Sequence, residues 1–431
     1  MKVAFYTLGC KVNSYETEAV LEKFKNSGYE IVNYEEFSDI YVVNSCMVTN
    51  AGEKKSKQII RRPLKLNPQA IVIVMGCLTQ LKADEILKIP GVKIVLGTKN
   101  RDKIVDYLEE YLTNKKTLNK VTELEKKEEY DSLAIIDFEN HKRAFIKIQD
   151  GCNNFCTYCI IPYTRGRVRS KSKDTIIDEV KHLVGNGHIE VVLTGIHTGG
   201  YGADLKDYSL VDLLKDLEKI QGLKRIRISS IEISEISDSM LETIAKSEKI
   251  VHHLHVPLQS GSDKVLKNMN RKYTTNEYRL MINHIRKAIP DVAFTTDVIV
   301  GFPGETATDF EEAYNFIKSV GFQELHVFPF SRRKGTPADK MLEQIDTDTK
   351  KLRVHRLIKL SEDLKKDHIL NNLGTIHYCI AEQIKNGYLV GHTRDYISVK
   401  FIGDKSLLGK EVRVKLLSYD NPYTLAKIEK K

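Results

Sequence analysis

The sequence contains no long hydrophobic run at its amino terminus. The first apolar stretch covers only about six residues before Gly9, Cys10 and Lys11, which is too short for a signal peptide or a membrane span. No sequence-wide repeat is visible either, so a repeat-built fold is not indicated. With 431 residues the chain exceeds one ordinary core. We therefore expect two or three domains in a cytoplasmic protein without membrane association.

Cysteine is also scarce, with seven residues in the whole chain. Because cytosolic thiols are kept reduced, these cysteines indicate metal or redox chemistry rather than a framework of disulfides. Six of them fall into two patterns. The seventh, Cys379, lies in a strand-like run over residues 376–381, where a small buried side chain is its expected role.

Three cysteines are closely spaced. Cys152, Cys156 and Cys159 follow the apolar stretch 145–148, and random placement would give their spacing only about once in a thousand such sequences. Thiolates are natural ligands of iron–sulfur clusters, and a four-iron cube held by three of them leaves one iron open for chemistry. A structural zinc site is the alternative. It needs four ligands, but no fourth cysteine lies nearby and a presumed strand separates His141 from the run.

The first segment of the chain alternates strand-like and helical runs, which is typical of a parallel sheet covered by helices. A helix is expected from about Ser14 to Asn26, with Asn13 as its cap and Glu16 completing a capping box. The strand-like runs cover residues 3–8, 40–44, 71–75 and 93–96.

The other three cysteines, Cys10, Cys46 and Cys77, each come one or two residues after one of these strand-like runs. In an open parallel sheet the carboxyl ends of neighbouring strands meet at one edge, where such folds bind ligands. We therefore expect the three cysteines to converge on one centre. Three ordinary buried cysteines are the alternative, although loop formers or small polar residues flank each of them.

A second series of strand-like runs begins after residue 141, with stretches long enough for helices between them. Six such units predict a partial (βα)6 barrel, whose active site lies at the carboxyl ends of the strands. The run of three cysteines follows the first of these strands, and the open side of the barrel would admit a large substrate. The strand-like runs cover residues 144–149, 191–194, 225–229, 253–256, 294–300 and 324–330.

The carboxyl-terminal segment contains short strand-like runs separated by turns, which predict a small, OB-like β-barrel of a kind that binds nucleic acid. From residue 370 onward, ten Lys and Arg stand against six Asp and Glu, so this end holds nearly half of the net charge of +9. This excess favours an anionic partner. A charge-rich linker and a helical connector complete the expected division into residues 1–115, 116–140, 141–350, 351–371 and 372–431.

The spacing of Cys152, Cys156 and Cys159, with Tyr158 before the last of them, resembles that of the radical S-adenosylmethionine (SAM) enzymes. This resemblance implies that the open iron chelates the amino and carboxylate groups of SAM. It also implies that an electron from the cluster splits SAM into methionine and a deoxyadenosyl radical. Such a radical takes hydrogen from an unactivated carbon.

Two cysteine trios in this order, followed by a basic terminal barrel, resemble the methylthiotransferases, which have a cluster domain, a radical SAM domain and a TRAM domain. The resemblance covers essentially the whole chain. It implies that Cys10, Cys46 and Cys77 hold an auxiliary [4Fe-4S] cluster whose open iron carries sulfur, while the second [4Fe-4S] cluster cleaves SAM. One SAM would methylate the sulfur and another would activate the target carbon. Further runs that resemble this family cover residues 229–232, 255–262, 296–305 and 328–333.

Several residues are candidates for binding SAM, because hydroxyls, carboxylates and exposed backbone at strand ends bind its methionine ammonium and ribose in related barrels. A strand-end cap or a turn is the alternative role for each. The candidates are Tyr158, Thr194, Gly195, Ser229, Ser230, Glu232, Gln259 and Asp297.

Three arginines follow the cysteine run. Arg165, Arg167 and Arg169 alternate with other residues, so an extended segment would place their guanidinium groups on one face beside the cluster. Their forked donors suit the anionic oxygens of RNA phosphates. A solvated or salt-bridged edge is the alternative.

The runs over residues 7–13 and 193–202 most resemble the branch of the family that acts on threonylcarbamoyladenosine. The resemblance implies addition of a methylthio group to the adenine C2 of N6-threonylcarbamoyladenosine next to the tRNA anticodon. The implied partners are the anticodon stem-loop and an electron-donor protein, and the sulfur donor stays unassigned. Four alternatives stay open: isopentenyladenosine in tRNA, an aspartate of a ribosomal protein, a radical SAM enzyme without sulfur transfer, and a non-catalytic zinc-stabilised RNA-binding protein.

Overall fold

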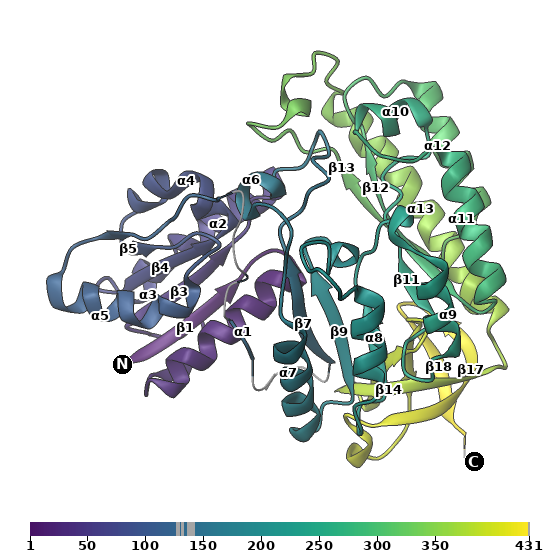
Figure 1. Ribbon diagram of the computed structural model, residues 1–431, viewed down its shortest axis with the longest axis horizontal. Coiled ribbons are helices and arrows are strands. Elements are labelled where there is room, and N and C mark those ends of the chain that lie inside the picture. Colours follow the sequence, from purple (N-terminus) through teal and green to yellow (C-terminus); the bar gives the residue numbers. More distant parts are fainter. Residues whose placement is uncertain (126–129, 131–132, 136–142, 430–431) are drawn as a thin grey trace.

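The computed structural model describes residues 1–125, 130, 133–135 and 143–429. It has an α/β architecture with a parallel sheet first, a partial barrel of strands and helices next, and a small closed β-barrel last (Figure 1). This confirms the predicted fold class. In the part of the chain that the structure describes, no helix combines the length and the apolar character that crossing a membrane requires.

The amino-terminal sheet has six strands, all paired in parallel, in the order β2-β1-β3-β4-β5-β6. The strands are β1 Lys2–Thr7, β2 Glu30–Val32, β3 Ile40–Ser45, β4 Ile71–Gly76, β5 Val92–Val95 and β6 Leu118–Asn119. The helices are α1 Lys11–Asn26, α2 Asn50–Ile60, α3 Pro63–Leu66, α4 Cys77–Leu87 and α5 Ile104–Asn114, with η1 Arg101–Lys103 before the last. Successive side chains of β3 point to opposite faces, so Val42 packs with α1 and α5 while Val43 packs with α2, α3 and α4.

Helix α1 begins earlier than the sequence predicted. Cys10 is its N-cap and makes no side-chain capping hydrogen bond, so the predicted cap by Asn13 and Glu16 is wrong. Asn13 lies inside the helix, and its Nδ2 donates to the carbonyl oxygens of Leu8 and Ser45 at 2.7 and 3.3 Å. Glu16 is buried among cations. Both polar side chains bind groups of neighbouring elements, which a local capping pattern does not display.

The partial barrel contains the six predicted strands. They are β7 Arg143–Asp150, β9 Glu190–Gly195, β10 Arg225–Ile228, β11 His253–His255, β12 Ala293–Val300 and β13 Glu324–Pro329, and β8 Arg169–Ser170 pairs antiparallel with β7. The parallel bridge between Ile226 and Ile250 joins the sheet of β7, β9 and β10 to the sheet of β11, β12 and β13. The helices are α6 Ile161–Arg165, α7 Lys173–Gly185, α8 Leu210–Glu218, α9 Asp238–Lys246, α10 Asp263–Asn268, α11 Thr275–Ala288 and α12 Ala307–Val320, with η2 Thr198–Gly200, η3 Ile233–Glu235 and η4 Pro337–Lys340.

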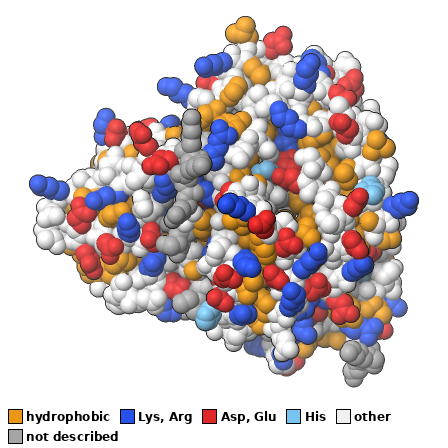
Figure 2. Space-filling model, in the orientation of Figure 1, with side chains coloured by type: hydrophobic (Ala, Val, Ile, Leu, Met, Phe, Trp, Pro, Cys, Tyr) orange, Lys and Arg blue, Asp and Glu red, His pale blue; other side chains and the backbone are white. Residues whose placement is uncertain are grey.

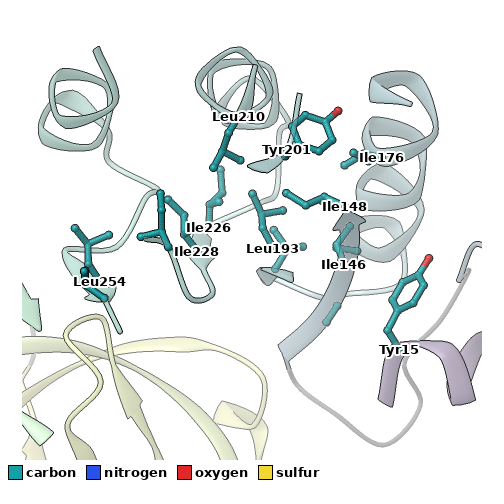
Figure 3. Close-up of a cluster of buried hydrophobic side chains, with 14 of the residues drawn as sticks. Tyr15, Ile146, Ile148, Ile176, Leu193, Tyr201, Leu210, Ile226, Ile228 and Leu254 are labelled. Atoms are coloured by element: carbon teal, nitrogen blue, oxygen red, sulfur yellow. The ribbon is translucent and has the colours of Figure 1, made fainter. Parts of the chain in front are cut away.

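One hydrophobic core continues from the amino-terminal sheet into the barrel. Figure 3 shows Tyr15 of α1 beside Ile146 of β7, followed by Leu193, Ile228 and Leu254 on successive strands of the barrel. Each of these side chains is almost fully buried, and full burial of a side chain of this size contributes roughly 1.5–3 kcal/mol. The shared core fixes the carboxyl ends of the two sets of strands relative to each other.

The segment expected to be a linker, residues 116–140, lies partly outside the described residues, as does His141. Its described residues are not simply solvated. Strand β6 extends the first sheet, and Leu133 and Ile135 are buried in the shared core. Tyr15 Oη donates to the carbonyl oxygen of Leu133 at 3.0 Å. The charge-rich composition of this segment did not indicate that its few apolar side chains pack into a core formed by residues distant in the sequence.

Helix α13, Thr347–Asn371, leads into the terminal barrel and begins before the predicted connector. Five strands close this barrel in the order β14-β15-β16-β18-β17. They are β14 Ile376–Lys385, β15 Tyr388–Thr393, β16 Ser398–Phe401, β17 Glu411–Asp420 and β18 Tyr423–Ile428, with η5 Lys405–Leu407 between β16 and β17. Cys379 lies fully buried in its core, as expected for a small structural side chain. Arg225 of β10 joins the two barrels, since its Nε binds Glu411 at 2.7 Å.

Candidate active site

A cavity of about 480 Å³ lies between the three parts of the chain. Cys10 and Lys11 reach it from the start of α1, polar side chains reach it from the barrel strands, and Tyr396 reaches it from the terminal barrel. The surrounding protein lowers the pKa of the Lys11 ammonium, mainly by removing water from it. Burial lowers the pKa of His253 in the same cavity, and the charges of Arg227 and Lys11 add to this effect.

A second cavity of about 220 Å³ adjoins the first. Cys152, Cys156 and Cys159 line it. Ser230 and Asp297 line both cavities, so the two spaces meet just after β10 and beside the middle of β12. Cys10 and the central cysteines therefore face connected spaces, although they are far apart in the sequence.

The amino-terminal cysteines converge at one edge of the first sheet. Glycine precedes two of them at positive φ, 109° at Gly9 and 105° at Gly76, where other residues are strained. A Cβ at Gly9 would lie 3.2 Å from Cys46 Sγ, which shows how closely the turns after β1 and β3 approach. Burial raises the pKa of the Cys46 thiol to about 11, and the charges of Cys77 and Cys10 contribute. The turns thus bring all three thiols into mutual electrostatic range.

The central cysteines are surrounded by hydrogen-bond donors. The backbone N–H of Asn154 donates to Cys152 Sγ at 3.5 Å, and Arg271 Nη1 donates to Cys156 Sγ at 3.3 Å. Burial raises the pKa of the Cys159 thiol to about 12, so this group is protonated without a metal. Iron deprotonates a thiol that it binds, and the nearby N–H donors then stabilise the thiolates. Three thiols with such donors fit an iron–sulfur cluster.

Among the described residues, no three His, Cys, Asp or Glu side chains are arranged to hold a single metal ion. The assignment of all six cysteines as ligands stays a prediction.

Two residues at this site were missed from the sequence. His197 Nε2 contacts Glu235 Oε1 at 2.5 Å. Burial lowers the pKa of His197, but hydrogen bonds to Cys152 and Glu235 outweigh it and raise the pKa to about 10, so this side chain is cationic beside a cysteine at neutral pH. The strand-end rule that selected Thr194 could have found it. Arg271 follows α10 and no signal in its local sequence marks it.

The structure brings all eight SAM candidates to the two cavities. Ser229 is 8% exposed, and its Oγ has no hydrogen-bond partner among the described residues, so a ligand can use it. Glu232 forms an ion pair with Arg271. Asp297 Oδ1 lies 3.3 Å from His255 Nε2. Thr194, Gly195 and Ser229 line the first cavity, Tyr158, Glu232 and Gln259 line the second, and Ser230 and Asp297 line both.

The expectation that three arginines share one face of an extended segment is wrong. Arg165 ends helix α6 and is fully buried, and Arg169 lies in β8 with 4% exposure. Both pair with Asp150, at 3.2 and 3.6 Å. Arg167 is exposed, with its guanidinium 4.6 Å from the centre of the Phe155 ring. Gly166, at φ 74°, turns the chain between them, and an alternation in sequence does not reveal this turn.

A buried ionic network joins the first sheet to the barrel beside the cavities. Glu16 of α1 lies 2.5 Å from Arg101 Nη1, 2.7 Å from Arg165 Nη1 and 2.8 Å from Lys147 Nζ. Burial by itself raises the pKa of Glu16, but these cations outweigh it and hold the pKa well below its usual range. The network fixes α1, which begins at the first cavity, against β7 and α6, which flank the second.

Replacing Glu16 by glutamine is expected to reduce the free energy of unfolding by about 3–5 kcal/mol at pH 7, because it removes the buried carboxylate that Arg101, Arg165 and Lys147 share and leaves their charges undercompensated. A depressed carboxyl pKa stabilises the fold above the unfolded value, so the difference from wild type should shrink as pH falls below about 4.3. Urea unfolding followed by circular dichroism measures this. The exposed Glu36→Gln serves as control, with an expected change within about 0.5 kcal/mol. Equal stabilities of the two variants would contradict the role of Glu16.

Two family models match the chain. The model of the Radical SAM superfamily matches residues 146–317, and that of the uncharacterized protein family UPF0004 matches residues 2–97. The first match covers most of the barrel, including the central cysteines but not β13, and the second covers strands β1 to β5 with the amino-terminal cysteines. The radical SAM model implies SAM and a [4Fe-4S] cluster as cofactors.

Solved structures share the architecture at low sequence identity. The radical SAM methyltransferase TsrM from Kitasatospora setae has a TM-score of 0.57 at 13% identity, over 78% of this chain and 76% of that one. The cobalamin-dependent SAM radical enzyme OxsB has a TM-score of 0.52 at 12% identity, over 81% of this chain and 56% of that one. These similarities support the fold alone.

Curated relatives match over nearly the full length. The threonylcarbamoyladenosine tRNA methylthiotransferase MtaB of Bacillus subtilis is 48% identical over 98% of this chain and 95% of its own. MtaB of Aquifex aeolicus is 40% identical over 96% of this chain and its whole length. A tRNA-2-methylthio-N(6)-dimethylallyladenosine synthase of Clostridium botulinum is 38% identical over 95% of this chain and 93% of its own. With Cys10 and the three central cysteines on adjoining cavities, the chain belongs to the radical SAM tRNA methylthiotransferase family.

Proposed function

We propose that this enzyme adds a methylthio group to the adenine C2 of N6-threonylcarbamoyladenosine, next to the anticodon of tRNA. The observation that carries the proposal is that Cys10 of the amino-terminal trio lines one cavity, that all three central cysteines line a second, and that the two cavities share Ser230 and Asp297. Sulfur and an activated carbon must meet to form a new bond, and connected cavities permit this. The names of the relatives at 48% and 40% identity support the choice of nucleoside.

Each cavity would have a distinct task. Cys10, Cys46 and Cys77 would hold the auxiliary [4Fe-4S] cluster at the first cavity. The cysteines of the second cavity would hold the cluster with SAM, which supplies radical chemistry at an unactivated carbon. The protein contributes hydrogen-bonding groups: Arg271 and the backbone N–H of Asn154 donate to the central thiolates. Ser229, from the adjoining first cavity, offers the cofactor a hydroxyl that has no hydrogen-bond partner among the described residues. Two SAM molecules would serve each turnover.

The RNA would enter from the open side of the barrel, with the target base splayed out of the anticodon loop into the first cavity. On the face drawn in Figure 2, Lys and Arg are interspersed with Asp and Glu. The basic excess of the terminal barrel and the exposed Arg167 are the proposed phosphate contacts. An electron-donor protein completes the set of proposed partners, and the cytoplasm is the proposed location.

The proposed division of labour follows the predicted domain boundaries. Residues 1–115 would form the auxiliary-cluster domain, residues 141–350 the radical SAM barrel, and residues 372–431 the RNA-binding TRAM domain. Residues 351–371 would connect the last two. The partly buried ion pair of Arg225 with Glu411 and the buried pair of Arg165 with Glu16 support a fixed arrangement of these parts.

Mass spectrometry of tRNA nucleosides tests this function. In cells that lack the protein, we expect methylthio-threonylcarbamoyladenosine to disappear and its precursor without the methylthio group to accumulate, and complementation should reverse both changes. The methylthio derivative of isopentenyladenosine is the internal control and should not change. Loss of that derivative instead, or modification of a ribosomal protein alone, would contradict the proposed substrate.

A further inference from the structure

The first cavity contains two cations and two carboxylates from four different elements. Three of the four are held by partners in the described structure. Arg227 Nε binds Glu190 at 3.0 Å, Glu324 binds Lys365 at 2.9 Å, and Asp297 lies 3.3 Å from His255. Each of these three side chains therefore already has a partner in the protein.

Lys11 differs from the other charged groups of this cavity. Among the described residues, no hydrogen bond or ion pair holds its ammonium group. Its side chain stays exposed, yet it lines the cavity, so it projects into the cavity rather than packing on the wall. An unpaired cation that projects into a cavity favours an anionic ligand, because the two form a charge-assisted hydrogen bond.

The walls near Lys11 show a second sign of a polar ligand. His253 is 6% exposed and lines the cavity, and its Nδ1 has no hydrogen-bond partner among the described residues. Its Nε2 contacts Thr295 Oγ1 at 3.2 Å, which fixes the ring. The Tyr396 ring, which also lines the cavity, stacks on the imidazole with centroids 5.1 Å apart. Buried polar groups are normally hydrogen-bonded, so a polar group of a ligand is expected here.

We propose that Lys11 binds the carboxylate of the threonylcarbamoyl group and thereby selects this nucleoside over adenosines with neutral N6 substituents. This proposal rests on the proposed function. The chemistry of the nucleoside supports it: the outer ureido N–H can donate to ring N1, which folds the threonyl group toward the edge of the base that carries C2. Lys11 directly follows Cys10, so a carboxylate at this edge would lie beside the first trio when C2 faces it.

The test uses the full-length, cluster-reconstituted enzyme and three anticodon stem-loop RNAs of one sequence. The first carries threonylcarbamoyladenosine, the second its neutral threonine methylamide, and the third isopentenyladenosine. Dissociation constants are measured by fluorescence anisotropy and product formation by mass spectrometry. For Lys11→Met, we expect binding of the first RNA to weaken by about tenfold or more, with the other two unchanged, because a hydrogen bond to a charged group is lost.

Two further variants make the comparison specific. Lys11→Arg keeps the charge and should retain most of the preference for the anionic RNA. Lys23→Met removes a lysine from the last turn of the same helix, outside both cavities, and should match wild type. Iron content and circular dichroism are compared for all variants.

Three outcomes would overturn the assignment of Lys11. Lys11→Met could weaken binding of all three RNAs equally, or it could leave the preference for the anionic RNA unchanged. The third outcome is loss of that preference in Lys23→Met. If Lys11→Met loses its iron, all three RNAs are affected alike, and this result also counts against the assignment of Lys11. The proposed function fails separately, if wild-type enzyme neither binds nor modifies the RNA with threonylcarbamoyladenosine.

Discussion

Replacing Cys156 by alanine is expected to abolish cleavage of SAM. Cys156 is 9% exposed at the second cavity and receives a hydrogen bond from Arg271, so its thiolate would be a fixed corner of the cluster. Two remaining cysteines cannot hold a four-iron cube of the three-cysteine type, and without a reduced cluster no electron reaches SAM. Chromatography of deoxyadenosine after reduction measures the loss. We also expect iron to fall from about eight to about four per chain.

Cys379→Ala is the matched control for this experiment. It makes the same substitution at a fully buried cysteine, in the core of the terminal barrel and away from both cavities. Its iron content and deoxyadenosine yield should equal those of wild type. If Cys156→Ala still produces deoxyadenosine, or if Cys379→Ala loses it, the assignment of the central cluster is wrong.

Cys46→Ala is expected to separate the two activities. Methylthio transfer to tRNA should fall below detection, because the auxiliary site loses one of three ligands, while SAM cleavage persists. Cys46 is buried directly after β3 and approaches the turn at Gly9, so no neighbouring cysteine can take its place without rebuilding that turn. Nucleoside mass spectrometry and the deoxyadenosine yield measure the two activities on the same sample.

The iron content distinguishes this result from simple unfolding. Cys46→Ala should keep about four irons per chain and an unchanged circular dichroism spectrum, as Cys379→Ala keeps about eight. Retained transfer of the methylthio group would refute the auxiliary site. Loss of SAM cleavage together with transfer would show that the two trios do not act separately.

Much of this site could be predicted from the sequence because its residues sit at strand ends. A strand of four to eight apolar residues is visible locally, and in parallel sheets the residue after it lies at a known edge. This rule located Cys10, Cys46 and Cys77, and it placed Ser229 and Asp297 at the barrel mouth. All of them line a cavity or lie at the edge of the sheet that faces one.

The same local reasoning failed for Glu16, Arg165 and Arg169. Their sequence patterns indicated a capping box and an extended basic edge, and both readings would expose these side chains to water. In the structure Glu16 and Arg165 are fully buried against each other, although they are 149 residues apart. A buried ion pair is stable only when its partners come from elements that packing brings together, and no short window contains both.

The sequence by itself determined the order of the three parts, the two cysteine trios and their places after strands, because strand period and cysteine spacing are local properties. Only the tertiary structure decided which polar groups face inward. The shared core from Tyr15 to Leu254 sets the two cavities side by side. Pairing of the other charged side chains leaves Lys11 as the charged group of the first cavity that has no partner among the described residues. Which polar side chains face the cavities depends on contacts between segments that are distant in the sequence, and only the packing of the folded chain establishes these contacts.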